Sequence, residues 1–374
     1  MVVSMNTTTS TDVFVAGGGP AGLAAAIAAR QRGLSVIVAD AAHPPIDKAC
    51  GEGLLPDAVR TLGDLGVEIG AGDARPLRGI RFLTATGAAA AIFPDEAFGL
   101  GIRRTVLHRA MTNRIENLGI QCLWGTSVRG IEGNEVTLQD RKIRAHWIVG
   151  ADGASSRVRQ WAGLDHPRPR TKRYAFRQHY QMAPWTDHVE VYWSSAGQIY
   201  VTPVGDGEVG VALISRTPQL RVECALELFP ELAARLAQAN VISRERGATT
   251  GMRKLRSIWA GNVALVGDAS GTVDAISGEG IGLGFHQAAL LADCLHDGDL
   301  ASYQSWHVRL SRRPRWMGHM LLALDGRPRL QERTLRVFQK SPDLFAKLLA
   351  LHVGTPAADF ARNTLSLGWS LLTT

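Results

Sequence analysis

The glycine-rich segment GGGPAG at residues 17–22 constrains the fold of this 374-residue chain more than any other feature. It follows an apolar run at residues 13–16 and precedes an alanine-rich stretch, residues 23–32, whose composition favours a helix. A second apolar run at residues 34–39 ends at Asp40. A strand, a tight turn, a helix and a second strand within about 30 residues predict a βαβ unit.

Each glycine of this segment has its own expected role. Gly17 permits the turn off the strand, Gly19 lets a pyrophosphate approach the backbone, and Gly22 lets helix and strand pack closely. An acid at the end of the second strand is placed to accept hydrogen bonds from ribose hydroxyls. A glycine-rich turn without a ligand is the alternative, but the flanking strands and the terminal acid favour dinucleotide binding. The predicted contacts are Gly17, Gly19, Pro20, Ala21, Gly22 and Asp40.

A second motif far along the chain favours FAD over NAD(P). The apolar run at residues 263–266 ends at Gly267 and Asp268, and a carboxylate at the end of a buried strand suits the polyol chain of a flavin. The segment GEGIGLG at residues 278–284 would offer free backbone N–H groups at a helix start. The alternatives are a helix N-cap for Asp268 and a flexible loop for the glycines. Gly267, Asp268, Gly278, Gly280 and Ile281 are the predicted contacts.

Three spaced motifs, residues 17–22, GADG at residues 150–153, and Gly267-Asp268 with residues 278–282, resemble one family. It is the superfamily of FAD oxidoreductases that contains p-hydroxybenzoate hydroxylase, geranylgeranyl reductases and flavin-dependent halogenases. The resemblance covers most of residues 12–300 and implies bound FAD, with NAD(P)H binding transiently. A plain β-turn is the alternative for residues 152–153. The further FAD contacts that the resemblance implies are Lys48, Gly51, Arg104, Val128, Asp152 and Gly153.

The branch of the superfamily is suggested by KACGEG at residues 48–53, which resembles a stretch of the geranylgeranyl reductases, as does SGEGI at residues 277–281. Other positions depart from each branch. GDASG at residues 267–271 differs from the GDAAH of phenol hydroxylases, and Tyr200 and Thr202 replace the Trp and Phe of a lipid-pocket motif in the reductases. The halogenase Trp-x-Trp-x-Ile-Pro stretch is absent from the sequence. Candidate pocket residues are Cys50, Glu52, Tyr200 and Pro203.

The expected activity is that of an NAD(P)H-driven monooxygenase in which a flavin C4a-hydroperoxide, formed from dioxygen, hydroxylates or epoxidises an apolar aromatic, polyketide or terpenoid molecule. The alternative is reduction of an alkene of geranylgeranyl type, with Cys50 in the pocket. Halogenation is a second alternative, and a ligand-binding flavoprotein without turnover is the candidate from another class. Because the cofactor carries the chemistry, no catalytic side chain is assigned.

The predicted fold class is α/β, with a Rossmann-like FAD-binding domain interleaved with an antiparallel substrate sheet and followed by C-terminal helices. Strands are expected at residues 147–150 and 262–266 and helices at 107–118 and from 278 to about 296. Alternation of β-branched or aromatic residues with polar ones predicts the substrate sheet. FAD-binding segments are expected at 12–72, 101–165 and 256–300, substrate segments at 73–100 and 166–255, and a helical cap at 301–374, broken at Pro314, Pro328, Pro342 and Pro356.

The net charge of +7 is confined to residues 301–374, which hold eleven Lys or Arg and four Asp or Glu. Without a nucleic-acid motif, this excess predicts a solvated basic face and no specific nucleic-acid binding, leaving open weak peripheral contact with an anionic membrane. The apolar stripe of Phe345, Leu348, Leu349 and Leu351 is expected to pack in the core. Four cysteines without metal-site spacing, no spanning segment and no signal peptide at residues 1–12 favour a metal-free cytoplasmic protein.

Overall fold

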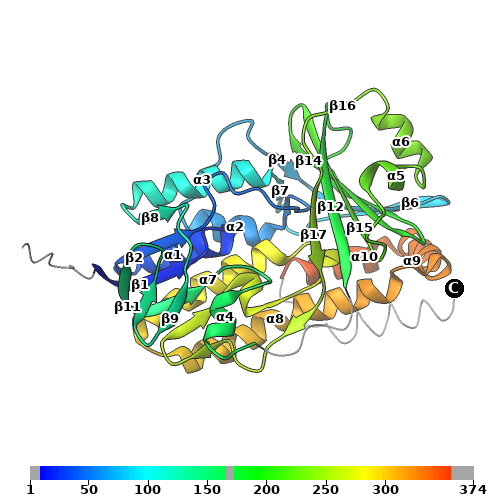
Figure 1. Cartoon of the computed structure of the whole chain (residues 1–374). Helices are drawn as coiled ribbons and strands as arrows, with labels where there is room; N and C mark the ends of the chain where they lie inside the picture. Colours follow the sequence, from blue (N-terminus) through cyan, green and yellow to red (C-terminus); the bar gives the residue numbers. More distant parts are fainter. Residues whose placement is uncertain (1–8, 166–171, 355–374) are drawn as a thin grey trace, which may run out of the picture.

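Two large β-sheets organise the chain in the computed structural model, which describes residues 9–165 and 172–354 (Figure 1). The first sheet has the order β19-β20-β11-β1-β2-β8, and its five strands from β20 to β8 run parallel. A hairpin of β9 and β10 extends it beside β11. The bounds are β1 Thr9–Ala16, β2 Val36–Asp40, β8 Gln121–Trp124, β9 Gly130–Glu132, β10 Glu135–Thr137, β11 Lys142–Gly150, β19 Trp259–Ala260 and β20 Val263–Leu265.

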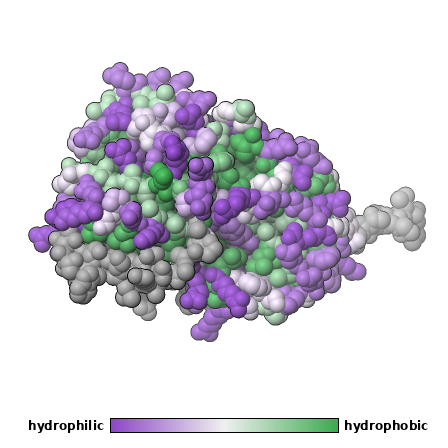
Figure 2. Space-filling model, turned by 180° about the vertical axis from the view of Figure 1, so that it is seen from behind, coloured by the Kyte–Doolittle hydropathy of each residue, from purple (hydrophilic) through white to green (hydrophobic). Residues whose placement is uncertain are grey.

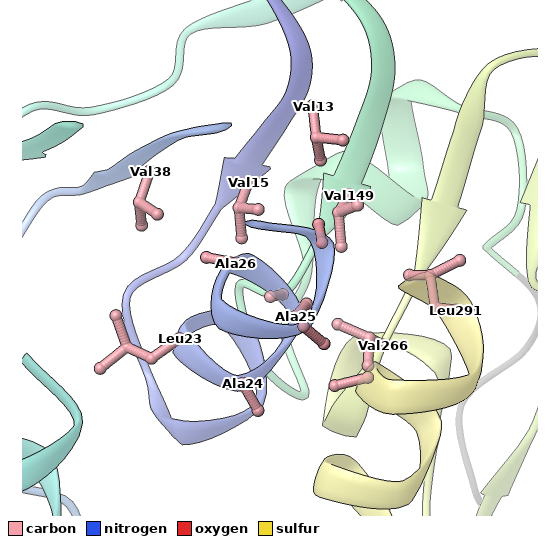
Figure 3. Close-up of a cluster of buried hydrophobic side chains, with 14 of the residues drawn as sticks. Val13, Val15, Leu23, Ala24, Ala25, Ala26, Val38, Val149, Val266 and Leu291 are labelled. Atoms are coloured by element: carbon pink, nitrogen blue, oxygen red, sulfur yellow. The ribbon is translucent and has the colours of Figure 1, made fainter. Parts of the chain in front are cut away.

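Helix α1 (Pro20–Gln31) packs on this sheet because its alanines let it approach both the strands and α7 (Gly280–Asp297). Figure 3 shows the alanines of α1 between the valines of β1, β2 and β11 on one side and Leu291 of α7 on the other. The βαβ unit expected from the sequence is therefore present. The remaining helices of this part are α2 Pro56–Asp64, α3 Arg104–Asn117 and α4 Arg157–Trp161.

The second sheet has the order β16-β12-β15-β14-β13-β5-β6, with β17 also paired to β12. Its pairs are antiparallel except β5 with β13, which run parallel. The chain forms much of the first sheet between these two strands. Its bounds are β5 Gly79–Thr84, β6 Gly87–Ile92, β12 Arg173–Gln181, β13 His188–Trp193, β14 Gly197–Gly205, β15 Glu208–Ser215, β16 Asn240–Val241 and β17 Arg246–Thr250. Two short helices, α5 Val222–Leu226 and α6 Pro230–Leu236, pack beside it.

Smaller elements connect the two sheets. A three-stranded sheet of β3 (Gly53–Leu54), β7 (Gly99–Gly101) and β4 (Arg75–Leu77) is separate from both, so part of the segment 73–100 lies outside the second sheet. Strands β18 (Arg253–Lys254) and β21 (Gly271–Thr272) form a two-stranded ladder. Two 3₁₀ turns, η1 (Gly267–Ser270) and η2 (Ala275–Ser277), lie between β20 and α7.

Three helices, α8 (Leu300–Leu324), α9 (Pro328–Lys340) and α10 (Pro342–His352), end the described chain. Pro328 and Pro342 begin α9 and α10, where their missing N–H groups are not needed. The break predicted at Pro314 is wrong: α8 continues through this buried proline, because packing along a 25-residue helix outweighs one lost hydrogen bond. Pro356 lies outside the described residues.

The apolar stripe of α10 is buried, as expected, and contacts β6 of the second sheet and α9. Across the described residues, no helix is both long and apolar enough to cross a bilayer. Figure 2 shows hydrophilic side chains over most of the face opposite to that of Figure 1, with smaller hydrophobic areas between them. The α/β fold class with interleaved parallel and antiparallel sheets and C-terminal helices is confirmed.

Candidate active site

A cavity of about 1220 Å³ lies between the first sheet, the second sheet and the C-terminal helices. Its volume exceeds the roughly 300–1,000 Å³ of a pocket for one small ligand. Glycine-rich turns of the first sheet line one part, and apolar side chains of the second sheet and of α8 to α10 line the other. We call these parts the nucleotide cleft and the apolar lobe. Together they have room for a cofactor and a substrate.

The glycines of the first turn open the nucleotide cleft in different ways. Gly17 has a φ of +117°, and a Cβ on Gly22 would lie 1.9 Å from the Gly17 carbonyl oxygen, so both positions require glycine for backbone packing. A Cβ on Gly19 would meet only the Arg104 Nη2 atom, at 3.8 Å. Gly19, Pro20 and Ala21 line the cavity at the start of α1, where the helix dipole favours a phosphate.

Asp40 ends β2 at the rim of this cleft. Its Oδ2 accepts a hydrogen bond from the Gly18 backbone N at 2.7 Å and its Oδ1 one from the Ala42 N at 2.8 Å. These bonds fix the carboxylate while each oxygen keeps a lone pair for a ribose hydroxyl. Val128 also lines the cavity, following β8 along the chain.

Arg104 begins α3 and borders the same cleft. Its backbone N donates to Glu52 Oε1 at 2.9 Å, and its Nε is buried without a hydrogen-bond partner among the described residues. A cation in this position, beside Gly19, suits an anionic ligand. One turn further along α3, burial lowers the pKa of His108, so its ring stays neutral and Nε2 donates to the Gly18 carbonyl at 2.8 Å.

The downstream motif faces the first turn from the end of β20. Gly267 has a φ of +59°, and a Cβ there would lie 2.7 Å from the Ala21 Cβ, so glycine allows η1 to approach α1. Asp268 lines the cavity and its Oδ2 lies 3.4 Å from Lys48 Nζ. Val266 occupies the N-cap position of η1 and Asp268 lies inside that turn, so Asp268 is not its N-cap residue.

Gly278 and Gly280 border the cleft where α7 begins, beside Ile281. Nothing lies within 4 Å of a Cβ built on either glycine, so their backbone is open to a ligand. Asp152 and Gly153 line the cavity too, although Asp152 Oδ2 also accepts from the Arg157 and Val158 backbone N atoms at 2.7 and 3.2 Å and so holds the start of α4.

The nucleotide cleft therefore fits FAD. It combines exposed glycine backbone with Asp40 at the end of β2 and Asp268 at the position expected for the flavin. Arg104 adds a buried Nε without a hydrogen-bond partner among the described residues. Within residues 9–165 and 172–354, no cluster of three His, Cys, Asp or Glu side chains could hold a metal ion.

Cys50 and Gly51 line the cavity in the loop between β2 and β3. Cys50 Sγ accepts a hydrogen bond from the Glu52 backbone N at 3.3 Å, and burial raises the pKa of its thiol. The cysteine therefore carries its proton at neutral pH and presents a neutral, weakly polar group to the cavity.

Glu52 acts mainly as an anchor for this loop. It adopts a positive φ of 59°, and its Oε2 lies 2.6 Å from His179 Nε2 of β12, which is fully buried. Arg177, on the same strand, hydrogen-bonds both His179 and Asp47. Sequence reasoning missed His179, Arg177 and Asp47, because nothing in the sequence pairs a loop before residue 53 with a strand more than a hundred residues later.

Tyr200 lines the cavity from β14, and its hydroxyl donates to the Ile276 carbonyl at 2.8 Å. Burial raises its pKa, so the phenol stays neutral. Pro203 is not among the residues that line the cavity; its carbonyl instead packs on Gly101 of β7. The expectation for Pro203 as a pocket residue is therefore wrong, because it sits past the point where β14 leaves the cavity wall.

The apolar lobe is the part that the sequence predicted least. Helical periodicity in residues 301–352 indicated apolar faces but could not distinguish core packing from a pocket wall. The side chains of this lobe include Leu77, Ile80, Phe82, Val191, Trp193, Met317, Met320, Leu324, Phe338, Phe345, Leu348 and His352.

The family follows from a match of residues 10–297 to the model of the FAD binding domain. This chain belongs to that FAD-binding family. It is 29% identical over 325 residues to a menaquinone reductase of Mycobacterium tuberculosis, covering 79% of each chain. It is 28% identical over 297 residues to digeranylgeranylglycerophospholipid reductase 1 of Methanothermobacter thermautotrophicus, covering 73% and 74%.

The fold is shared with PqsL of Pseudomonas aeruginosa, a probable FAD-dependent monooxygenase, with a TM-score of 0.71 at 23% identity over 85% of this chain and 97% of that one. The superfamily expected from the three motifs is thus confirmed. The protein is therefore an FAD-dependent oxidoreductase.

Proposed function

We propose that this protein reduces a carbon–carbon double bond in the prenyl chain of an isoprenoid lipid or quinone. Bound FAD would supply the hydride chemistry between a reduced nicotinamide and the substrate. The chain's own task is then to bind an apolar molecule beside the flavin, exclude water and supply a proton.

The apolar lobe is the observation that carries this proposal. It continues directly from the nucleotide cleft, and its walls are aliphatic and aromatic side chains from β5, β13, α8, α9 and α10. An extended hydrocarbon chain gains about 25 cal/mol per Å² of surface that it buries there. Few polar groups interrupt these walls, so the lobe suits a prenyl chain better than a compact polar substrate.

Cys50 supports the same chemistry. It lines the cavity in a loop that also contains Lys48, the partner of Asp268, and its buried thiol keeps a proton. A neutral thiol beside an alkene draws less water into the pocket than a charged group would. The menaquinone reductase and the digeranylgeranylglycerophospholipid reductase reported above, at 29% and 28% identity, are both named as reductases, which supports reduction over oxygen insertion.

The test is anaerobic turnover. Holoenzyme with NADPH or dithionite and a menaquinone in detergent micelles should give a product two hydrogens heavier, without dioxygen. Cys50→Ala should alter the rate of that reaction, while Cys50→Ser should keep the FAD content and flavin spectrum of the wild type. A product that forms only in air would contradict the proposal.

Hydroxylation or epoxidation by dioxygen, favoured from the sequence, is the second candidate. Tyr200 and Thr202 support it, since both replace the larger apolar residues of the reductase lipid-pocket motif and line this cavity. Mass-labelled dioxygen distinguishes the two: the second candidate requires one labelled oxygen atom in the product, and Cys50→Ala would then act only as a small packing change.

A further inference from the structure

A second, smaller cavity of about 400 Å³ lies outside the wall of the active site. Residues Gly53 to Leu55 and Gly278 line both cavities, so only this short stretch of backbone and its neighbours separate them. We call the smaller one the outer cavity. It is also lined by ionisable side chains that the proposed reaction has not used, namely Asp57, Glu279, His286, Arg309 and Arg313.

Glu279 and His352 meet across this wall. Glu279 lines the outer cavity, His352 lines the apolar lobe, and Glu279 Oε2 lies 3.6 Å from His352 Nδ1. The side chains are 4% and 8% exposed. Neither Glu279 oxygen, nor His352 Nδ1, has a hydrogen-bond partner within the described part of the chain. Burying two polar groups without hydrogen-bond partners lowers the stability of the fold, so such a pair calls for a functional role or a bound water.

The charges around Glu279 come from several elements. Arg313 of α8 lies 3.7 Å from Glu279 Oε1 but pairs more closely with Asp57 of α2, at 2.9 Å. Asp57 in turn lies 3.3 Å from His286 Nε2 on α7. Arg313 therefore pairs more closely with Asp57 than with Glu279, and the two carboxyl groups share this one arginine.

This setting favours the protonated acid beside a neutral imidazole. Burial raises the pKa of Glu279 to about 8; Asp57 adds to that rise, while Arg313 and the nearby Ser277 hydroxyl oppose it. Burial lowers the pKa of His352 to about 4, helped by Arg313, while Asp57 and a hydrogen bond with the Ser277 backbone oppose this shift. At neutral pH the pair thus holds one transferable proton, on Glu279, next to a ring that can accept it.

We propose that Glu279 and His352 form a proton relay that carries protons from the outer cavity into the apolar lobe. This inference rests on the proposed reduction, in which one alkene carbon receives a hydride and the other must receive a proton. The proton on Glu279 passes to His352 Nδ1 as the His352 Nε2 proton passes to the substrate carbon. After product release Glu279 takes up one proton from solvent in the outer cavity, and water lets the His352 ring return its proton from Nδ1 to Nε2, so each turnover consumes one hydride and one solvent proton.

The coupling of the two residues can be measured without any substrate. In FAD-loaded full-length protein labelled with ¹⁵N-histidine, the His352 imidazole should stay neutral from pH 5 to 9, and its ring ¹⁵N signals should move in a step near pH 8 as Glu279 ionises. His352→Gln assigns the signals by removing them, and Glu279→Gln should abolish the step. A wild-type ring without that step, or a step that persists in Glu279→Gln, would overturn the relay.

The kinetic consequence is a change in the pH profile. On the menaquinone probe, wild-type turnover should fall above about pH 8, because the ionised acid has no proton to give. Glu279→Gln should lower kcat about a hundredfold and remove that fall, and Glu279→Asp should restore part of both. Flavin bleaching by NADPH should be unchanged, since that step does not use the relay.

Glu227→Gln is the matched control, because it makes the same change at an exposed residue at the end of α5. It should keep the wild-type rate and pH profile. Wild-type rates in Glu279→Gln with an unchanged profile would refute the relay. If wild-type protein fails to reduce the probe at all, the proposed reduction is wrong, while the ¹⁵N measurement still decides whether Glu279 and His352 are coupled.

Discussion

At the scale of single residues, neighbouring positions of one motif carry different constraints. Gly22 and Gly19 both belong to the first glycine turn, but only Gly22 is closed off by backbone, whereas Gly19 faces open cavity. The fold therefore requires glycine at position 22, whereas ligand binding requires glycine at position 19. Substitutions at the two positions should therefore separate folding from cofactor binding.

Gly19→Val should lose FAD while keeping the apoprotein folded, because its side chain would point at the cavity and at the end of the Arg104 side chain. Its cost in the free energy of unfolding should be at most about 1 kcal/mol, as for a poor N-cap residue. Gly22→Ala should instead destabilise the protein by about 1–3 kcal/mol or more, since its Cβ meets the Gly17 carbonyl. Flavin absorbance and thermal unfolding of both apoproteins measure this; equal losses of stability would contradict it.

Asp268→Ala should lower FAD retention with little change in stability. The ion pair that it removes, with Lys48, is about half exposed, and such pairs contribute about 0–1 kcal/mol. Titration of apoprotein with FAD, followed by flavin fluorescence, measures the affinity. Unaltered affinity would exclude Asp268 from the flavin site.

At the scale of elements, the C-terminal helices serve as both core and pocket wall. In α10, Phe345 stacks on Phe338 of α9 with ring centroids 4.3 Å apart and an angle of 8° between the ring planes. The same side chains line the apolar lobe. The helices therefore couple the stability of the cap to the shape of the substrate pocket.

Phe345→Ala should lower the free energy of unfolding by about 3–5 kcal/mol and enlarge the apolar lobe. Chemical denaturation measures the first effect, and the KM for menaquinone measures the second. Leu228→Ala is the control, because that leucine is 46% exposed and should cost little. A loss of stability as small as that of the control would mean that α10 does not pack as described.

At the scale of the whole molecule, the free energy of unfolding should depend on pH, because Glu279, His307 and His352 are buried in their neutral forms. As pH rises from about 5 to 8, the unfolded chain releases a proton that native Glu279 keeps, so stability falls. As pH falls from about 6.5 to 4, the histidines of the unfolded chain bind protons, whereas native His307 and His352 stay neutral because burial lowers their pKa, so stability falls again. Below about pH 6.5 the two histidines together outweigh Glu279, so the thermal midpoint should be highest at about pH 6.5, and Glu279→Gln should flatten the alkaline side.

The basic excess in residues 301–374 predicts weak, salt-sensitive attraction to anionic vesicles. Co-sedimentation with phosphatidylserine vesicles should fall as salt rises past about 0.1 M, where the Debye length is about 10 Å. Neutral phosphatidylcholine vesicles are the control. Binding that survives high salt would indicate apolar insertion instead.

The sequence was most informative where a local motif dictates local geometry. The first glycine turn, Asp40, Gly267 and Asp268 lie where their spacing placed them, because a βαβ unit brings strand ends and helix starts to one edge of a sheet. It was least informative where contacts join distant segments. The pairing of Glu52 with His179 and of Glu279 with His352 depends on how sheets and helices stack, which no periodicity encodes. The helix break expected at Pro314 was wrong, because tertiary packing keeps α8 continuous despite the low helix propensity of proline.

The interleaving of the two sheets also has a consequence for protein synthesis. During synthesis, β1 cannot pair with β11 until residues 142–150 have emerged. The segments β20, η1 and α7, which complete the cleft facing α1, emerge later still. A nascent chain that has left the ribosome as far as the second sheet still lacks Asp268 and Gly278. We therefore expect FAD to bind late in translation, and the apolar surface of α1 to be exposed to aggregation until these later segments emerge.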